Sequence, residues 1–146
     1  MDPNKRISEI MSINLICVRP DEKAATIREI FVKHDFHHLP VTNTDGILVG
    51  MISQVDFHRI SYNLSQQTTG PTWTTKAYDS MEAQDFMTTQ PLSIRPDDSV
   101  GLAADIFLAN KFHALPVIQG KELVGLVTTH DLLAYSFKSP IESTIN

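Results

Sequence analysis

The sequence has a single cysteine, no long apolar run and no excess of positive charge. Cys17 cannot form an internal disulfide, and within the apolar residues 15–18 its expected role is packing. With 12 Lys and Arg against 17 Asp and Glu, the net charge of −5 argues against a nucleic-acid binder that relies on phosphate contacts. Apolar runs such as residues 47–49 are too short for a membrane span, which needs about 20 residues, and no signal peptide is recognisable. These absences predict a cytoplasmic protein that neither spans a membrane nor binds nucleic acid.

The remaining composition is that of an ordinary folded protein. Apolar residues make up 42% of the 146 positions and charged residues 20%, so disorder over most of the chain is excluded. A chain of this length buries roughly 70% of its unfolded surface. The length therefore suits one domain, or two small halves that share a core.

The chain repeats itself once, at an offset of 76 residues that falls to 75 after a one-residue gap. Five blocks match in order, which chance does not produce, and such repeats determine the fold. The matched blocks are Val18–Glu22 with Ile94–Asp98, Ile30-Phe31 with Ile106-Phe107, Phe36–Val41 with Phe112–Val117, Leu48–Ser53 with Leu123–Thr128, and Asp56-Phe57 with Asp131-Leu132.

Each copy predicts the order β-α-β-β-α. The Arg-Pro-Asp string should end the first strand, because proline interrupts strands, and should provide an acidic cap for the next helix. Ile27, Ile30, Phe31 and His34 lie at helical spacing, as expected of a buried stripe. The expected ranges are Leu15–Val18, Glu22–His34, Leu39–Thr42 and Ile47–Ile52 in copy one, Leu92–Ile94, Asp98–Lys111, Leu115–Ile118 and Glu122–Val127 in copy two, with second helices from near Ser53 and Thr128.

The region between the copies reads as an extended connection. It is rich in Ser, Thr and Gln, and Gly70-Pro71 interrupts any helix. Trp73 in this polar loop is expected either to pin the loop to the body of the protein or to contact another chain.

The repeated string is His-x-Leu-Pro-Val, a turn, then Leu-Val-Gly, two aliphatic residues, and Ser or Thr three residues before Asp. It resembles the CBS domain, named for cystathionine β-synthase, and two copies resemble a CBS pair, or Bateman module, with nothing else attached. The resemblance covers about residues 7–137 and implies an α/β (α+β) fold of two βαββα repeats packed about a pseudo-twofold axis. The boundaries it implies are 7–61 for repeat 1, 62–81 for the connecting loop, 82–137 for repeat 2 and 138–146 for a flexible tail.

The resemblance also implies two clefts that hold adenosine derivatives such as AMP, ADP, ATP or S-adenosylmethionine. The chemistry agrees, because a carboxylate on the first turn of a helix can accept both hydroxyls of a ribose, and the N–H groups of that turn suit a phosphate. Asp131 and Asp56 would be the ribose acceptors, with Thr128 and Ser53 at the phosphate end. By resemblance one cleft uses Thr128 and Asp131 with Leu15, Cys17, His37 and His38, and the other uses Ser53 and Asp56 with Leu92, Ile94 and His113.

The cations expected for phosphate binding are few. Relatives such as the gamma subunit of AMP-activated protein kinase carry arginine at the position of His38, and the second copy has Ala114 there. A neutral histidine binds anions more weakly than arginine does. We therefore expect at most one good phosphate site, the Asp131 cleft beside His38, and a preference for monophosphates or nucleosides. Arg59 and Lys111 are further cations that the sequence does not place.

A plainer role stays open for the two carboxylates, and a metal site is a second possible role for the histidines. Asp56 and Asp131 can simply cap their helices. The trio His34, His37 and His38 is a poor metal site, because adjacent residues on an extended segment point to opposite sides.

The predicted function is a stand-alone regulatory CBS pair that binds an adenine nucleotide, forms a homodimer and signals to an unidentified protein partner. No catalytic motif stands out, so we expect no enzyme activity, no metal and no obligatory cofactor. The alternative is a ligand-free interaction or dimerisation module.

Overall fold

The computed structural model describes residues 1–35, 37–59, 80–110 and 112–138, which form two compact units. Unit 1 comprises Met1–Leu15 and Leu92–Asn146, and unit 2 comprises Ile16–Pro91. Most of the connection predicted over residues 62–81, including Trp73, lies outside the described residues, as does the tail after residue 138.

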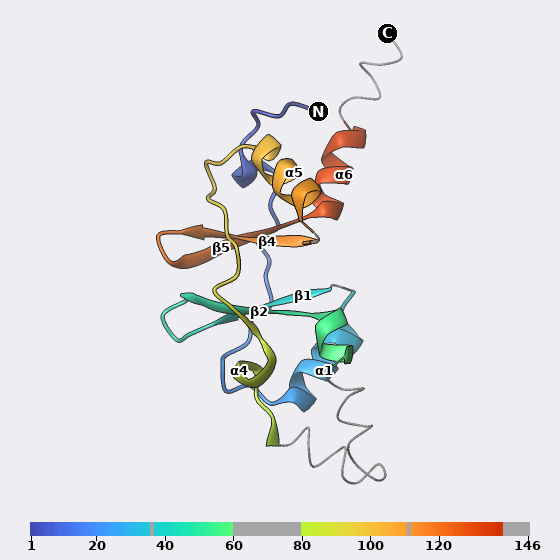
Figure 1. Ribbon diagram of the computed structural model, residues 1–146. Coiled ribbons are helices and arrows are strands. Elements are labelled where there is room, and N and C mark those ends of the chain that lie inside the picture. The colour runs from blue at the N-terminus through green and yellow to red at the C-terminus, as the bar shows by residue number, and fades with distance from the viewer. Residues whose placement is uncertain (36, 60–79, 111, 139–146) are drawn as a thin grey trace. The chain divides into compact units, whose positions relative to one another are not determined.

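Unit 2 is built around an antiparallel sheet of order β1-β2-β3. A hairpin joins β1 to β2, and Gly46 in its turn has φ of 79°, as expected of a glycine turn. Figure 1 shows α1 and the helix over residues 54–59 on one face of this sheet. The elements are α1 (Ala24–Lys33), β1 (His38–Thr42), β2 (Leu48–Ser53), α4 (Ala83–Phe86) and β3 (Thr88–Thr89). The core consists of Val18, Ala24, Ile27, Phe31, Leu39, Val41, Ile52, Phe57 and Ala83.

Unit 1 repeats this plan with the antiparallel hairpin β4-β5. Its helices α5 and α6 lie on one face of the hairpin (Figure 1), and Gly120 in the turn has φ of 67°. The elements are η1 (Ile7–Glu9), α5 (Val100–Ala109), β4 (Ala114–Gln119), β5 (Glu122–Thr128) and α6 (Thr129–Lys138). The core consists of Ile7, Ile94, Val100, Ala103, Leu115, Val117, Val127 and Leu132. The helices and hairpins predicted from the repeat are thus confirmed, except that His34 is exposed.

The leading segment of each repeat belongs to the unit formed by the other repeat. These exchanged segments are residues 1–15, which lie in unit 1 with repeat 2, and residues 80–91, which lie in unit 2 with repeat 1. Ile7, at the start of repeat 1, is fully buried in the core of unit 1, and its counterpart Ala83 is fully buried in unit 2. Met11 likewise packs against Gly125, and Met87 against Gly50. Each methionine thus packs on the other repeat, and neither unit has a complete core without its exchanged segment.

The prediction that an acidic residue caps the first helix of each repeat is wrong. No side chain caps α1, and the N–H of Ala24 donates instead to the carbonyl of Met81 (3.0 Å). In α5 the cap is Ser99, and the N–H of Val100 donates to the carbonyl of Lys5 (2.7 Å). The exchanged segments therefore supply acceptors for helix N–H groups that have no partner within the helix.

The strands predicted over Leu15–Val18 and Leu92–Ile94 are also wrong. Each is reduced to one parallel bridge, because the chain passes from one unit to the other at residues 15–16 and 91–92 and only the residue before Arg-Pro meets a neighbouring strand. The bridges are Val18 with Val41 and Ile94 with Val117.

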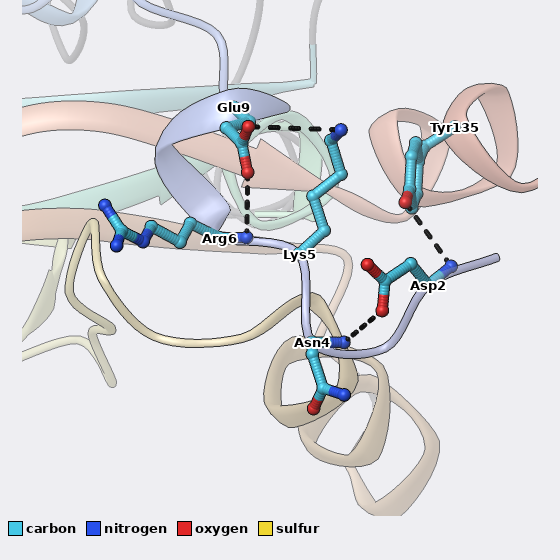
Figure 2. A network of polar contacts seen from close by, with 6 residues as sticks. All are labelled: Asp2, Asn4, Lys5, Arg6, Glu9 and Tyr135. Carbon is cyan, nitrogen blue, oxygen red and sulfur yellow. Dashed lines mark hydrogen bonds and ion pairs between the residues drawn. The ribbon is translucent and has the colours of Figure 1, made fainter.

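A polar network holds the first residues of the chain against α6 (Figure 2). The backbone N–H of Asp2 donates to the Tyr135 hydroxyl (3.3 Å), and the Lys5 ammonium lies 5.6 Å from the centre of the Tyr135 ring. Lys5 also pairs with Glu9 at 4.0 Å. Exposed contacts of this kind are individually weak, so the buried Ile7 is the main anchor of this segment.

Candidate functional site

In unit 1, Thr128 and Asp131 form a reciprocal cap where β5 ends and α6 begins. The N–H of Thr128 donates to Asp131 Oδ2 (2.9 Å), and the N–H of Asp131 donates to Thr128 Oγ1 (3.1 Å). This capping box satisfies backbone donors and fixes the orientation of the carboxylate. The cap engages one oxygen of a half-buried side chain.

In unit 2, Ser53 and Asp56 occupy the equivalent positions with a different arrangement. The N–H of Asp56 donates to Ser53 Oγ (3.0 Å). The Asp56 carboxylate forms an ion pair with Arg59, with 3.1 Å between Oδ1 and Nη2. Arg59 keeps 69% of its side-chain area exposed, and Asp56 keeps 40%. In repeat 2 the position of Arg59 is occupied by Ala134, so the two candidate ribose acceptors differ in charge environment.

His37, which precedes β1, and His38, the first residue of β1, lie beside Ser53 and Gln54 in unit 2. His38 is paired with Ser53 across the β1–β2 hairpin. Gln54 binds His37 twice, since its N–H donates to the His37 carbonyl (2.7 Å) and its Oε1 lies 2.8 Å from His37 Nδ1. Because an amide oxygen only accepts, Nδ1 is the donor in this contact. Gln54 was not singled out in the sequence, because its role depends on the strand pairing.

His113 lies at the matching place in unit 1, where its carbonyl accepts from the N–H of Thr129 (3.0 Å). Each repeat thus brings its own histidine next to its own Ser or Thr. The assignment of His37 and His38 to the site of Asp131, and of His113 to that of Asp56, relates residues of two units and stays a prediction.

The four apolar residues assigned to the clefts by resemblance, Leu15, Cys17, Leu92 and Ile94, lie close to the points where the chain passes from one unit to the other. Leu15 is half-buried and Leu92 is 48% exposed. Ile94 is 3% exposed in the core of unit 1, and both its backbone groups are bonded to β4. At the offset of 76, Cys17 matches Ser93, a half-buried residue that strict use of the repeat would have selected in place of Ile94.

Cys17 is half-buried beside Arg19. Burial raises the pKa of its thiol, and the positive charge of Arg19 partly opposes that shift. A thiol with a raised pKa is a poor nucleophile, in line with a packing role. Within the described part of the chain, no group of three or more His, Cys, Asp or Glu is arranged to hold a metal ion. In the same residues no helix is long and apolar enough to cross a bilayer.

The model of the CBS domain family matches the chain twice, over residues 7–62 and 83–138. The chain belongs to the CBS domain family. Among curated relatives, the uncharacterised protein MJ1426 of Methanocaldococcus jannaschii is 28% identical over 86% of this CBS pair and 90% of its own length. MJ1225 of the same organism is 24% identical over 92% of the pair and 48% of its own length. The chain spans about half or less of the first curated relatives it matches.

Solved CBS pairs share the fold. CBSX2, from Arabidopsis thaliana, was solved in complex with AMP and is 26% identical, with a TM-score of 0.77 over 91% of this chain and 96% of that one. The CBS pair of MJ0100, solved with 5′-methylthioadenosine and S-adenosyl-L-methionine, is 22% identical, with a TM-score of 0.72 over 93% of this chain and 98% of that one. The predicted tandem-repeat α/β fold is confirmed.

Proposed function

We propose that this CBS pair is a regulatory module that binds an adenosine-type ligand and reports its level to a protein partner. The observation that carries the proposal is the reciprocal cap of Thr128 and Asp131. It holds a carboxylate in a fixed orientation at the first turn of α6, with one oxygen engaged. A ribose diol offers two adjacent hydroxyl donors to such a group, and charge-assisted hydrogen bonds of this kind are strong.

The solved complexes support an adenosine-type ligand. CBSX2 holds AMP, and the MJ0100 pair holds two adenosine derivatives that differ in their 5′ substituent. Adenosine is the part these ligands share, so the ribose acceptors Asp131 and Asp56 are the residues on which the proposal depends. The proposed set keeps Thr128, Ser53, Leu15, Cys17, Leu92 and the three histidines His37, His38 and His113, and it omits the core residue Ile94.

Thermal unfolding with AMP, ADP, ATP, S-adenosylmethionine and GMP tests the proposal. A ligand at 100 times its dissociation constant adds about 2.7 kcal/mol, or roughly 5–10 °C in melting temperature for a chain of this size. We expect an adenine compound to give such a shift in the wild type and in Asp105→Ala, which removes an exposed carboxylate of α5. In Asp131→Ala the shift should fall or vanish. The readout is the ligand-induced shift in each variant, because the loss of the cap itself lowers the melting temperature.

A ligand-free dimerisation module is the second candidate. It is favoured by the exposed apolar side chains on the helices of unit 1, where Leu108 is 85% exposed and Phe137 63% exposed. A second chain that covered these side chains would remove their apolar surface from water, which stabilises association. This candidate predicts a concentration-dependent dimer in sedimentation experiments, unchanged by any nucleotide and by Asp131→Ala, with no ligand-induced shift in melting temperature.

A further inference from the structure

We infer that Arg59 makes the repeat 1 site, where Asp56 is the ribose acceptor, selective for a nucleotide that carries a phosphate. The repeat 2 site, where Asp131 is the acceptor, has Ala134 at that position and does not share this selectivity. This reverses the expectation from the sequence that the better phosphate site is the Asp131 cleft beside His38. The inference rests on the proposed function, because it takes Asp56 and Asp131 as ribose acceptors. It assigns to Arg59 a role in specificity.

The basis is the different use of two equivalent carboxylates. Asp131 is held by the N–H of Thr128 at 2.9 Å, a neutral donor of the backbone. Asp56 is held by the guanidinium of Arg59 at 3.1 Å, one turn further along the same helix. In α6 no Lys or Arg precedes Lys138, so the start of α6 lacks a counterpart of Arg59 on its own helix.

The ion pair of Asp56 and Arg59 is easily exchanged for another partner. Both side chains are well exposed, at 40% and 69%, and exposed pairs contribute little to stability. A neutral nucleoside would have to share the Asp56 carboxylate with Arg59. A nucleotide places its phosphate only a few bonds from the ribose diol, so Arg59 can turn from the carboxylate to the phosphate. The guanidinium binds phosphate in a bidentate manner, which favours the nucleotide.

The test measures dissociation constants for AMP and adenosine by calorimetry, with each site isolated. Asp131→Ala leaves the repeat 1 site, and Asp56→Ala leaves the repeat 2 site. Both proteins are measured in the same buffer at the same pH. In the Asp131→Ala protein we expect AMP to bind about tenfold more tightly than adenosine, the effect of one charge-assisted contact. In the Asp56→Ala protein we expect the two affinities to be within about twofold of each other.

Substitution of Arg59 should then remove the preference for AMP in repeat 1, and the introduction of arginine at the equivalent position should create it in repeat 2. In the Asp131→Ala background, Arg59→Ala should weaken AMP about tenfold and leave adenosine equal or slightly tighter. Arg59→Lys should retain part of the preference, because lysine keeps the charge without the planar fork. Ala134→Arg should give the repeat 2 site a preference for AMP. Arg28→Ala, which removes an exposed guanidinium of α1, is the matched control and should change neither affinity.

The outcomes separate this inference from the proposed function. If Arg59→Ala leaves the ratio of the two affinities unchanged, the inference is overturned and the proposed function stands. The same holds if the Asp131→Ala protein binds neither compound while the Asp56→Ala protein does, because repeat 1 is then not a site. If the wild type binds no adenosine compound at all, the proposed function fails and the inference with it.

Discussion

Thr128 and Asp131 each cap the other's backbone N–H, at 3.1 and 2.9 Å, so the principal candidate for ligand binding is also part of the helix it begins. The two interpretations that the sequence left open for Asp131, helix cap and ribose acceptor, are therefore compatible. The cap uses one hydrogen bond to Oδ2 of Asp131. A carboxylate has two oxygens that can each accept more than one hydrogen bond, so the group can also accept from a ribose. A substitution at this position acts on stability and on binding together, and the two effects need separate variants.

Asp131→Ala should lower the free energy of unfolding by about 1 kcal/mol, the usual cost of a lost N-terminal cap. Thr128→Ala should cost a similar amount, because it removes the acceptor for the N–H of Asp131. The double variant should cost less than the sum, since both residues act in one cap. Urea denaturation measures all three. Thr128→Ala keeps the ribose acceptor but removes a proposed contact at the phosphate end, so it should reduce the ligand-induced thermal shift less than Asp131→Ala does. Full additivity of the two costs would argue against a shared cap.

Gly50 and Gly125 leave room for the exchanged methionines, and the two sites predict different costs. A Cβ at Gly50 would lie 2.8 Å from Met87 Cγ and 3.1 Å from the backbone oxygen of Thr88. At Gly125 the close atoms all belong to the flexible side chain of Met11. Gly50→Ala should therefore destabilise by about 1–3 kcal/mol, as overpacking does, and Gly125→Ala by less.

Calorimetric unfolding of both variants checks this order. In the background of Met87→Ala, the cost of Gly50→Ala should fall, because the side-chain part of the clash is gone and only the Thr88 oxygen remains close. Equal costs at the two glycines, or no coupling with Met87, would contradict the packing described here.

The local elements could be predicted from the sequence because their signals are local. Glycines at positive φ mark the hairpin turns, and the spacing of Ile27 and Phe31 gives the buried face of α1. The Ser/Thr-x-x-Asp string gave the start of the second helix in each repeat. Comparing the copies residue by residue also shows that Arg59 has no counterpart in the second.

The exchange of leading segments could not be predicted in the same way. The bonds that attach these segments run to the backbone carbonyls of Lys5 and Met81, and any residue can supply a carbonyl. The expected acidic caps failed for this reason, since the acceptor at each helix comes from a distant part of the chain. The strand before Arg-Pro failed because the chain crosses between units there and leaves a single bridge.

Ile7→Ala should destabilise the protein by about 2–5 kcal/mol, although the residue lies in a short leading segment near the N-terminus. Its side chain is fully buried in the core of unit 1, so truncation leaves a cavity. The measurement is the free energy of unfolding in urea. Ile13→Ala is the matched control, because Ile13 is 67% exposed and such substitutions change stability by about 0.5 kcal/mol or less. A cost for Ile7→Ala as small as that of the control would mean that the segment is not docked.

Cys17 should react slowly with a disulfide reagent at pH 8, because burial raises its pKa and little thiolate is present. In the folded protein the reaction rate should still rise with pH at values where the rate of the urea-unfolded chain has already reached its plateau. Since the folded state keeps the thiol proton to higher pH, the stability that this group contributes is complete below the unfolded pKa and is lost as pH rises through the folded one. Arg19→Ala should slow the reaction further, as the charge of Arg19 lowers the pKa, whereas Arg28→Ala should not. Reaction at pH 8 as fast in the folded protein as in the unfolded chain would rule out a buried, packing thiol.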